Sequence, residues 1–103
     1  MNMENQMDTE NRFMVREGDY LAVFNSAHRV MKAESVLKSL GFAILLIPAP
    51  RQLMTDCALA LRISPDIKDD VLHALEQEQL APALIKRFIG GQYRNEYEFA
   101  EDN

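Results

Sequence analysis

Four short apolar runs and two helical patterns alternate in a fixed order along the chain, and this order constrains the fold more than any other feature. The apolar runs, each flanked by residues typical of turns, are residues 20–24, 43–47, 57–63 and 83–88. One helical pattern lies between the first two runs and the other lies between the last two. The order strand, helix, strand, strand, helix, strand predicts an α+β fold, a ferredoxin-like βαββαβ sandwich in which two helices cover one face of a four-stranded antiparallel sheet.

Both helical patterns carry start and stop signals. The first helix is expected to begin after Asn25 or Ser26, whose side-chain oxygen can accept a hydrogen bond from a backbone N–H of the first turn, and to end at Gly41. The second is expected to begin at Ser64, as a capping hydroxyl, with Pro65 at the first helical position. We therefore expect two helices of ordinary length, each with one apolar face.

Length and charge describe a small, acidic protein with one domain. The chain has 103 residues, of which 48% are hydrophobic, which is enough for one domain with a modest core. We expect the folded domain to span residues 19–89, between a flexible acidic arm at 1–18 and an acidic tail at 90–103. The net charge is −5 and no stripe of basic residues is present, so nucleic acid is not expected as a partner.

The cysteine content and the hydropathy pattern indicate the cytoplasm. A single cysteine cannot form an internal disulfide bond, which suits a reducing compartment. The N-terminal residues contain no apolar run typical of a signal peptide, and the longest apolar run, residues 42–50, is too short to span a bilayer. We therefore predict a cytoplasmic protein without a membrane partner.

Cys57 is the only residue with obvious nucleophilic chemistry. In the predicted topology the end of the first strand, the loop at 49–56 and the start of the third strand share one edge of the sheet, near the N-terminus of the first helix. Cys57 is in register with Leu59 and Leu61, so it is expected on the helix-covered face. Free backbone N–H groups of the helix and the Arg51 guanidinium would favour the nucleophilic thiolate there. The alternative is inert packing, because a lone cysteine in an apolar strand is usually a small buried hydrophobe.

Other residues suggest further hypotheses about the same edge. His28, in the first turn of the first helix, could act as a base for Cys57, although a solvated surface residue is the simpler interpretation. Arg51, Arg62 and the helix start at Ser26 could together bind a small anion. The two histidines and the one cysteine lie on different predicted elements, so no metal site is expected, and no cofactor is expected because no cofactor motif is present.

The sheet face opposite the helices also carries apolar residues, namely Leu45, Ile47, Ala58 and Ala60. An uncovered apolar face of this kind requires a partner. We therefore expect either docking of the terminal segments or a homodimer across this face.

Residues 20–88 resemble a family of small selenium or sulfur carrier-like proteins. The resemblance is carried by residues 20–26, by Ala33, Glu34 and Leu37 of the first helix, and above all by residues 47–51 and 57–62. In this family a proline-rich turn and an arginine precede a cysteine that opens an apolar strand. Glycine commonly follows that cysteine, whereas this chain has Ala58.

The resemblance implies a carrier that holds sulfur or selenium on Cys57 as a persulfide or selenosulfide, with Arg51 as the electrostatic partner of the thiolate. A donor protein would load the atom and an acceptor protein would receive it. The protein would then be an accessory rather than an enzyme with its own turnover. The alternative, which requires no chemistry, is a protein-interaction or regulatory module in which Cys57 is a core residue.

Overall fold

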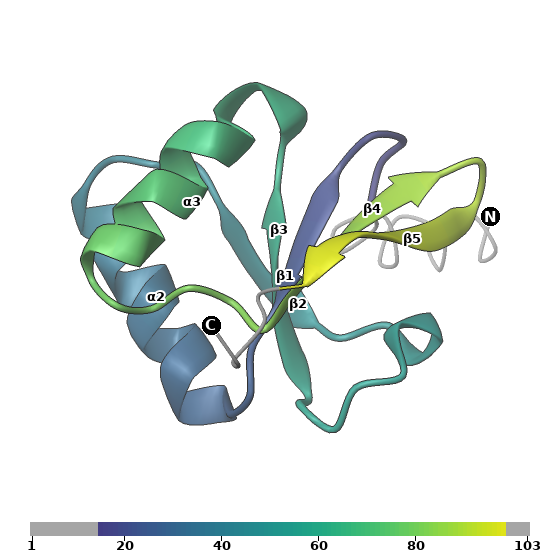
Figure 1. The fold of residues 1–103 in the computed structure, drawn as a ribbon, viewed down its shortest axis with the longest axis horizontal. Coiled ribbons are helices and arrows are strands. Elements are labelled where there is room, and N and C mark those ends of the chain that lie inside the picture. Colours follow the sequence, from purple (N-terminus) through teal and green to yellow (C-terminus); the bar gives the residue numbers. More distant parts are fainter. Residues whose placement is uncertain (1–14, 99–103) are drawn as a thin grey trace, which may run out of the picture.

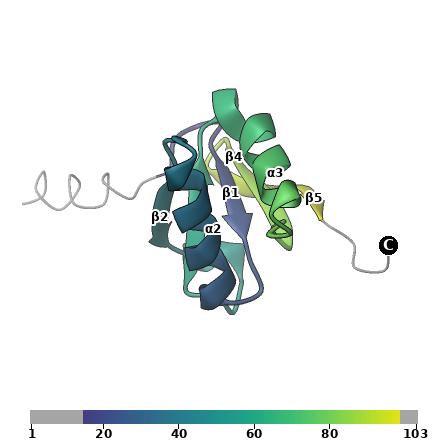
Figure 2. The ribbon, with the colours of Figure 1, turned by 90° about the vertical axis from the view of Figure 1, so that its left-hand side faces the viewer.

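The computed structural model describes residues 15–98, which form a five-stranded sheet with two helices packed on one of its faces (Figure 1). The strand order is β2-β3-β1-β4-β5, and each neighbouring pair is antiparallel. Figure 2 shows both helices on the same side of the sheet. The elements in chain order are β1 (Tyr20–Val23), α2 (Ala27–Ser39), β2 (Leu45–Pro48), the 3₁₀ turn η1 (Arg51–Leu53), β3 (Leu59–Ile63), the 3₁₀ turn η2 (Pro65–Ile67), α3 (Lys68–Gln77), β4 (Leu84–Ile89) and β5 (Gln92–Glu98).

The prediction of a four-stranded ferredoxin-like sheet is wrong, because residues 92–98 form a fifth strand that pairs with β4. Gly90 and Gly91 join the two strands with positive φ angles of 60° and 80°, as in many two-residue hairpin turns. The polar composition of β5 is typical of a tail, but an edge strand tolerates charged side chains because one of its edges faces solvent. The α+β class and the two helices agree with the prediction. Of the predicted arm and tail, residues 1–14 and 99–103 lie outside the described residues.

β1 is the central strand, and its side chains are buried on both faces. Its neighbours are β3 on one side and β4 on the other. Tyr20, Ala22 and Phe24 belong to the core cluster beneath the helices, whereas Leu21 and Val23 belong to a second cluster on the opposite face. This division follows from the alternation of side chains along a strand. An uninterrupted apolar run is what a strand covered on both faces requires.

The sheet face opposite the helices is covered in part by residues of the same chain. Leu53, from η1, and Val15, which precedes β1, are 2% and 4% exposed. Both pack in the second cluster with Ala60, and Phe88 and Tyr93 lie partly buried against it. The apolar face that the sequence predicts therefore exists, and its cover comes at least in part from within the chain.

The two helices begin differently. Ser26 caps α2 as predicted, and its Oγ accepts a hydrogen bond from the backbone N–H of Arg29 at 3.2 Å. Ser64 makes no such side-chain bond, because η2 intervenes before α3 begins. The turn is closed instead through the backbone, by the N–H of Ile67 donating to the Ser64 carbonyl at 3.2 Å. The predicted capping role of the Ser64 hydroxyl is therefore wrong.

Both helices end in the same left-handed turn. After α2, Gly41 has a φ of 90° and its N–H donates to the Lys38 carbonyl at 3.0 Å. After α3, Gln79 has a φ of 59° and its N–H donates to the Glu76 carbonyl, also at 3.0 Å. Glycine adopts this conformation freely, whereas a residue with a side chain is strained there by about 1–2 kcal/mol. Gln79 therefore occupies a position that suits glycine better.

Replacing Gln79 with glycine should raise the free energy of unfolding by about 0.5–1 kcal/mol, after the greater backbone entropy of glycine in the unfolded chain is subtracted. The hydrogen bond from Arg29 Nη2 to the Gln79 carbonyl, at 3.1 Å, involves only the backbone of residue 79 and is retained. Gly41→Ala is the matched control, because nothing lies within 4 Å of the added Cβ and only the strain in φ changes. That variant should lose about 1 kcal/mol. Urea denaturation measures both effects, and an unchanged or lower stability of Gln79→Gly would contradict the assignment of strain.

The ring of Tyr93, on β5, packs against Phe88 with the ring centroids 4.9 Å apart. Burial raises the pKa of Tyr93 above its ordinary value of 10.0. The folded protein therefore holds the phenolic proton more tightly than the unfolded chain does. This group should leave the free energy of unfolding unchanged well below pH 10.0 and lower it as the pH rises through the pKa of folded Tyr93. Urea denaturation below and above that pH should show that the free energy of unfolding falls less for Tyr93→Phe than for the wild type. Equal decreases in the two proteins would contradict the prediction.

Candidate functional site

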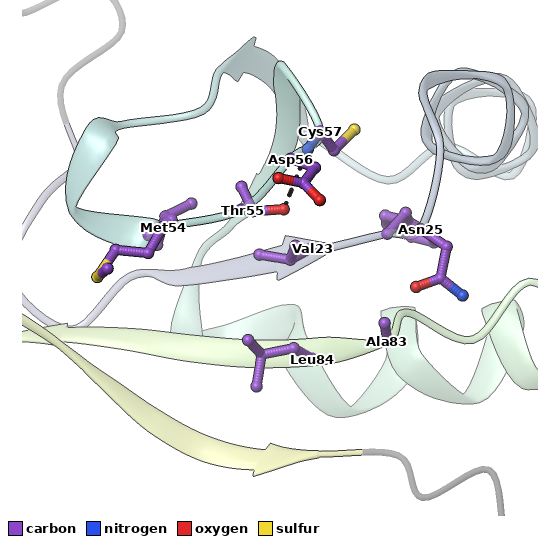
Figure 3. A pocket seen from close by; sticks show the side chains of 10 residues that line it. Val23, Asn25, Met54, Thr55, Asp56, Cys57, Ala83 and Leu84 are labelled. Carbon is purple, nitrogen blue, oxygen red and sulfur yellow. Dashed lines mark hydrogen bonds between the residues drawn. The ribbon is translucent and has the colours of Figure 1, made fainter.

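Cys57 lies just before β3, at the boundary between the core and the preceding loop. It is 9% exposed and belongs to the core cluster beneath the helices, together with Phe24 and Leu61. Its backbone N–H donates a hydrogen bond to Thr55 Oγ1 at 3.2 Å, and its sulfur points toward the side on which α2 lies (Figure 3). The prediction that Cys57 lies on the helix-covered face is confirmed.

A cavity of about 320 Å³ lies beside Cys57, at the end of the sheet where the central strand β1 stops and the neighbouring strand β4 begins. Three segments line it, namely residues 23–25, residues 53–57 and residues 83–84. A backbone hydrogen bond from the Ala83 N–H to the Val23 carbonyl, at 2.8 Å, joins two of these segments. The end of the first strand and the loop before the third strand therefore meet around Cys57.

The loop between β2 and β3 forms one wall of this cavity. A backbone hydrogen bond from the Ala49 N–H to the Ala58 carbonyl, at 2.8 Å, closes the base of the loop, and the buried Leu53 anchors its middle. Met54 follows with a φ of 54° and is 89% exposed. A left-handed conformation at a residue other than glycine costs about 1–2 kcal/mol and is found preferentially at functional sites. The loop thus presents a strained, exposed apolar residue at the rim of the cavity.

Arg51 and His28 do not line the cavity, although the sequence places both near Cys57. Arg51 is the first residue of η1 and is exposed, and within residues 15–98 its side chain makes no hydrogen bond or ion pair. His28 is exposed in the first turn of α2. The expected cationic partner and the expected base are therefore not among the residues that line the cavity beside Cys57.

Arg62 lies toward the other end of β3, where its Nε is 3.7 Å from Oδ2 of the buried Asp19. Five residues of extended chain separate Arg62 from Cys57, a distance of about 16 Å. The Ser26 hydroxyl is already engaged in capping α2. Within the described part of the chain, Arg51, Arg62 and Ser26 therefore do not form a common anion site.

Three polar side chains around the cavity, those of Asn25, Thr55 and Asp56, were not predicted to belong to the site. A threonine two residues before an extended segment is a known turn signal, because its hydroxyl can bond to a nearby backbone N–H. That signal could have identified Thr55. Nothing comparable marks Asp56 or Asn25, whose proximity to the thiol depends on how separate segments fold together.

Cys57 lines the cavity together with side chains that carry a hydroxyl, an amide and a carboxylate. No basic side chain is among its lining residues, so the site does not favour an inorganic anion. Between residues 15 and 98, no three side chains of His, Cys, Asp or Glu lie close enough together to hold a metal ion. In the same part of the chain, no helix has the length and apolar character needed to cross a membrane.

The chain matches a family model described as "Putative Se/S carrier protein-like" over residues 19–87, more than half of its length. The matched range begins just before β1 and ends within β4, so it contains both helices and all the residues that line the cavity. No curated protein and no solved structure matches the chain. By its match over residues 19–87, this chain belongs to the selenium and sulfur carrier-like family.

Proposed function

We propose that the protein carries a sulfur or selenium atom on Sγ of Cys57, as a persulfide or selenosulfide, and passes it to an acceptor protein. The observation that carries the proposal is the position of the chain's only thiol on the wall of a cavity of about 320 Å³. A single added atom needs little room, and this cavity is large enough for the atom and part of an incoming donor. The family match supports the choice of sulfur or selenium as cargo.

Loading is an exchange reaction at sulfur. The Cys57 thiol loses its proton to solvent, and the resulting thiolate attacks the terminal sulfur of a donor persulfide. A new S–S bond forms to Sγ, the S–S bond of the donor breaks, and the donor leaves as a thiolate. The transfer requires no external oxidant or reductant. Unloading repeats the same exchange with an acceptor thiolate, and selenium follows the same sequence of bonds.

The loop that ends at Cys57 controls access to the thiol in this proposal. With 9% of the residue exposed, a donor reaches the sulfur through the cavity or after a local opening of the loop. Thr55 holds the backbone of Cys57, and Met54 stands at the rim where a donor would arrive. Arg51, on the same loop but outside the cavity, would attract an anionic donor persulfide from solution, and a role as the direct partner of the thiolate would require the loop to move.

The proposed partners are a donor protein that bears a persulfide and an acceptor protein, in a reducing compartment such as the cytoplasm. A homodimer across the sheet face opposite the helices belongs to the same proposal. The support for it is the partial exposure of Leu45 and Phe88 on that face. Unlike the carrier role, the dimer rests on exposure alone.

A second candidate function is a protein-interaction or regulatory module in which Cys57 has no chemical role. The observation that favours it is the packing of Cys57 within the core cluster beneath the helices, where it is 9% exposed. Free cysteine commonly behaves as a small buried hydrophobe. The two functions differ in whether the folded protein accepts an atom at this sulfur.

Incubation with a cysteine desulfurase and cysteine, followed by intact-mass spectrometry under non-reducing conditions, should show a mass gain of one sulfur atom on the wild-type protein. Cys57→Ser is the control and should show no gain, because it retains the shape of the side chain but lacks the thiol. Absence of a gain on the wild type, together with slow alkylation of Cys57 in the folded protein, would reject the carrier and favour the interaction module.

Thr55→Val should make Cys57 more accessible, because it removes the acceptor of the Cys57 N–H hydrogen bond while nearly preserving the shape of the side chain. Loss of this hydrogen bond should lower the free energy of local opening of the loop by about 1 kcal/mol. If alkylation follows local opening, the rate of alkylation by iodoacetamide should then rise about fivefold. Thr55→Ser retains the hydroxyl and should react at the wild-type rate. Equal rates in the two variants would show that this hydrogen bond does not control access.

A further inference from the structure

A second cavity, of about 460 Å³, lies between the C-terminal end of α2 and one face of α3. It shares no lining residue with the Cys57 cavity. On the α3 side, the lining positions are 70, 73, 74, 77 and 78, which repeat at the three- and four-residue spacing of a single helix face. The remaining lining residues are Leu40 and Phe42, which follow α2. We call this feature the interhelical groove.

The floor of the interhelical groove is apolar. Leu40 is 57% exposed, one of the few large apolar side chains of the described chain that face solvent to this extent. Phe42 and Ala74 are partly buried and pack against the core cluster beneath the helices. The left-handed turn at Gly41 produces this arrangement, since the Phe42 N–H donates back to the Leu37 carbonyl at 3.0 Å and so holds Phe42 against the helix end. An exposed apolar floor of this kind is typical of a docking surface.

The rim of the interhelical groove is acidic. In its middle, Nε2 of His73 and Nε2 of Gln77 lie 3.3 Å apart and form a hydrogen bond with each other. At its two ends, the exposed carboxylates of Asp70 and Glu78 make no ion pair or hydrogen bond to any residue from 15 to 98. They are eight positions apart, in the first turn of α3 and at its C-cap, which corresponds to a rise of about 12 Å. The groove therefore presents two unpaired negative charges, one at each end of its α3 side.

We propose that the interhelical groove binds an amphipathic helix of a partner protein, with a large apolar side chain seated between Leu40, Phe42 and Ala74 and with lysine or arginine side chains facing Asp70 and Glu78. A helical ligand fits because two basic residues eight positions apart in a helix have the same spacing of about 12 Å as the two carboxylates. Charge complementarity selects a basic partner. A second copy of this chain, with its net charge of −5, is disfavoured for the same reason.

Fluorescence anisotropy with a designed probe tests this proposal on the full chain. The probe is a fluorescein-labelled peptide of about 14 residues that repeats Leu-Lys-Lys-Leu-Leu-Lys-Leu, an amphipathic basic helix. The comparison peptide has glutamate in place of every lysine. At low salt the basic peptide should bind the wild-type protein saturably and the acidic peptide should not. Absence of saturable binding by the basic peptide, or equal binding of both peptides, would overturn the proposal.

Matched variants separate the interhelical groove from the overall charge of the protein. Asp70→Lys with Glu78→Lys should weaken binding of the basic peptide by about tenfold, because two attractions become repulsions. Glu76→Lys with Glu96→Lys produces the same net charge at exposed positions outside the groove, and should weaken binding by no more than about twofold at moderate salt. Equal weakening by the two pairs would show that the peptide responds only to net charge and would overturn the proposal.

A second matched pair tests the apolar floor. Leu40→Ser removes an apolar side chain from the floor of the interhelical groove, whereas Met31→Ser removes a side chain of similar exposure, 52% against 57%, that does not line it. Only the first substitution should weaken peptide binding, by at least about fivefold. Far-ultraviolet circular dichroism and thermal melting establish that each variant is folded. Equal peptide affinities of the folded Leu40→Ser variant and the wild type would contradict the proposed packing of an apolar partner side chain against Leu40.

Discussion

The burial of β1 on both faces is the constraint on which the rest of this structure depends. β1 pairs with β3 and β4, so every other part of the sheet is placed relative to it. Leu21 and Ala22 have no exposed surface, and they belong to different core clusters on opposite faces of the sheet. The helices are fixed to one face by the first of these clusters, and Leu53 and Val15 are fixed to the other face by the second. A polar substitution in β1 would therefore damage both layers at once.

The same strand determines where Cys57 lies. β1 ends beside the start of β3, and the loop before β3 is held by Leu53, whose side chain reaches the face opposite the helices. Cys57, four residues later, has turned to the helix side. The chain therefore passes from one face of the sheet to the other between Leu53 and Cys57, and the residues in between line the cavity. This crossing explains how Cys57 can be both a member of the core cluster and part of a cavity wall, which is the combination that a protected but loadable thiol requires.

Sequence patterns predicted the parts of the fold that depend on local periodicity. The strands β1 to β4, both helices and the face of Cys57 follow from apolar runs and from alternation along a strand. β5 could not be recognised in this way, because its stability comes from pairing with β4 rather than from an apolar pattern of its own. The positions of Arg51 and Asp56 relative to the thiol depend on the conformation of the loop around Leu53 and Met54, which no periodicity specifies. The interhelical groove joins Leu40 to Asp70, and such a distant pairing exists only once the helices have packed.

α2 connects the two surfaces that carry the functional proposals. It begins two residues after Asn25, which lines the Cys57 cavity, and it is followed directly by Leu40, which lines the interhelical groove. Its 13 residues span about 20 Å, which is about two helix diameters. Leu40 and Phe42 therefore lie at the end of α2 opposite the Cys57 cavity, whereas Glu78 lies nearer its first turn, where Arg29 binds the carbonyl of the neighbouring Gln79. Because Val30, Ala33 and Leu37 are fully buried, α2 is fixed to the sheet along its length and would keep the two surfaces at a constant separation.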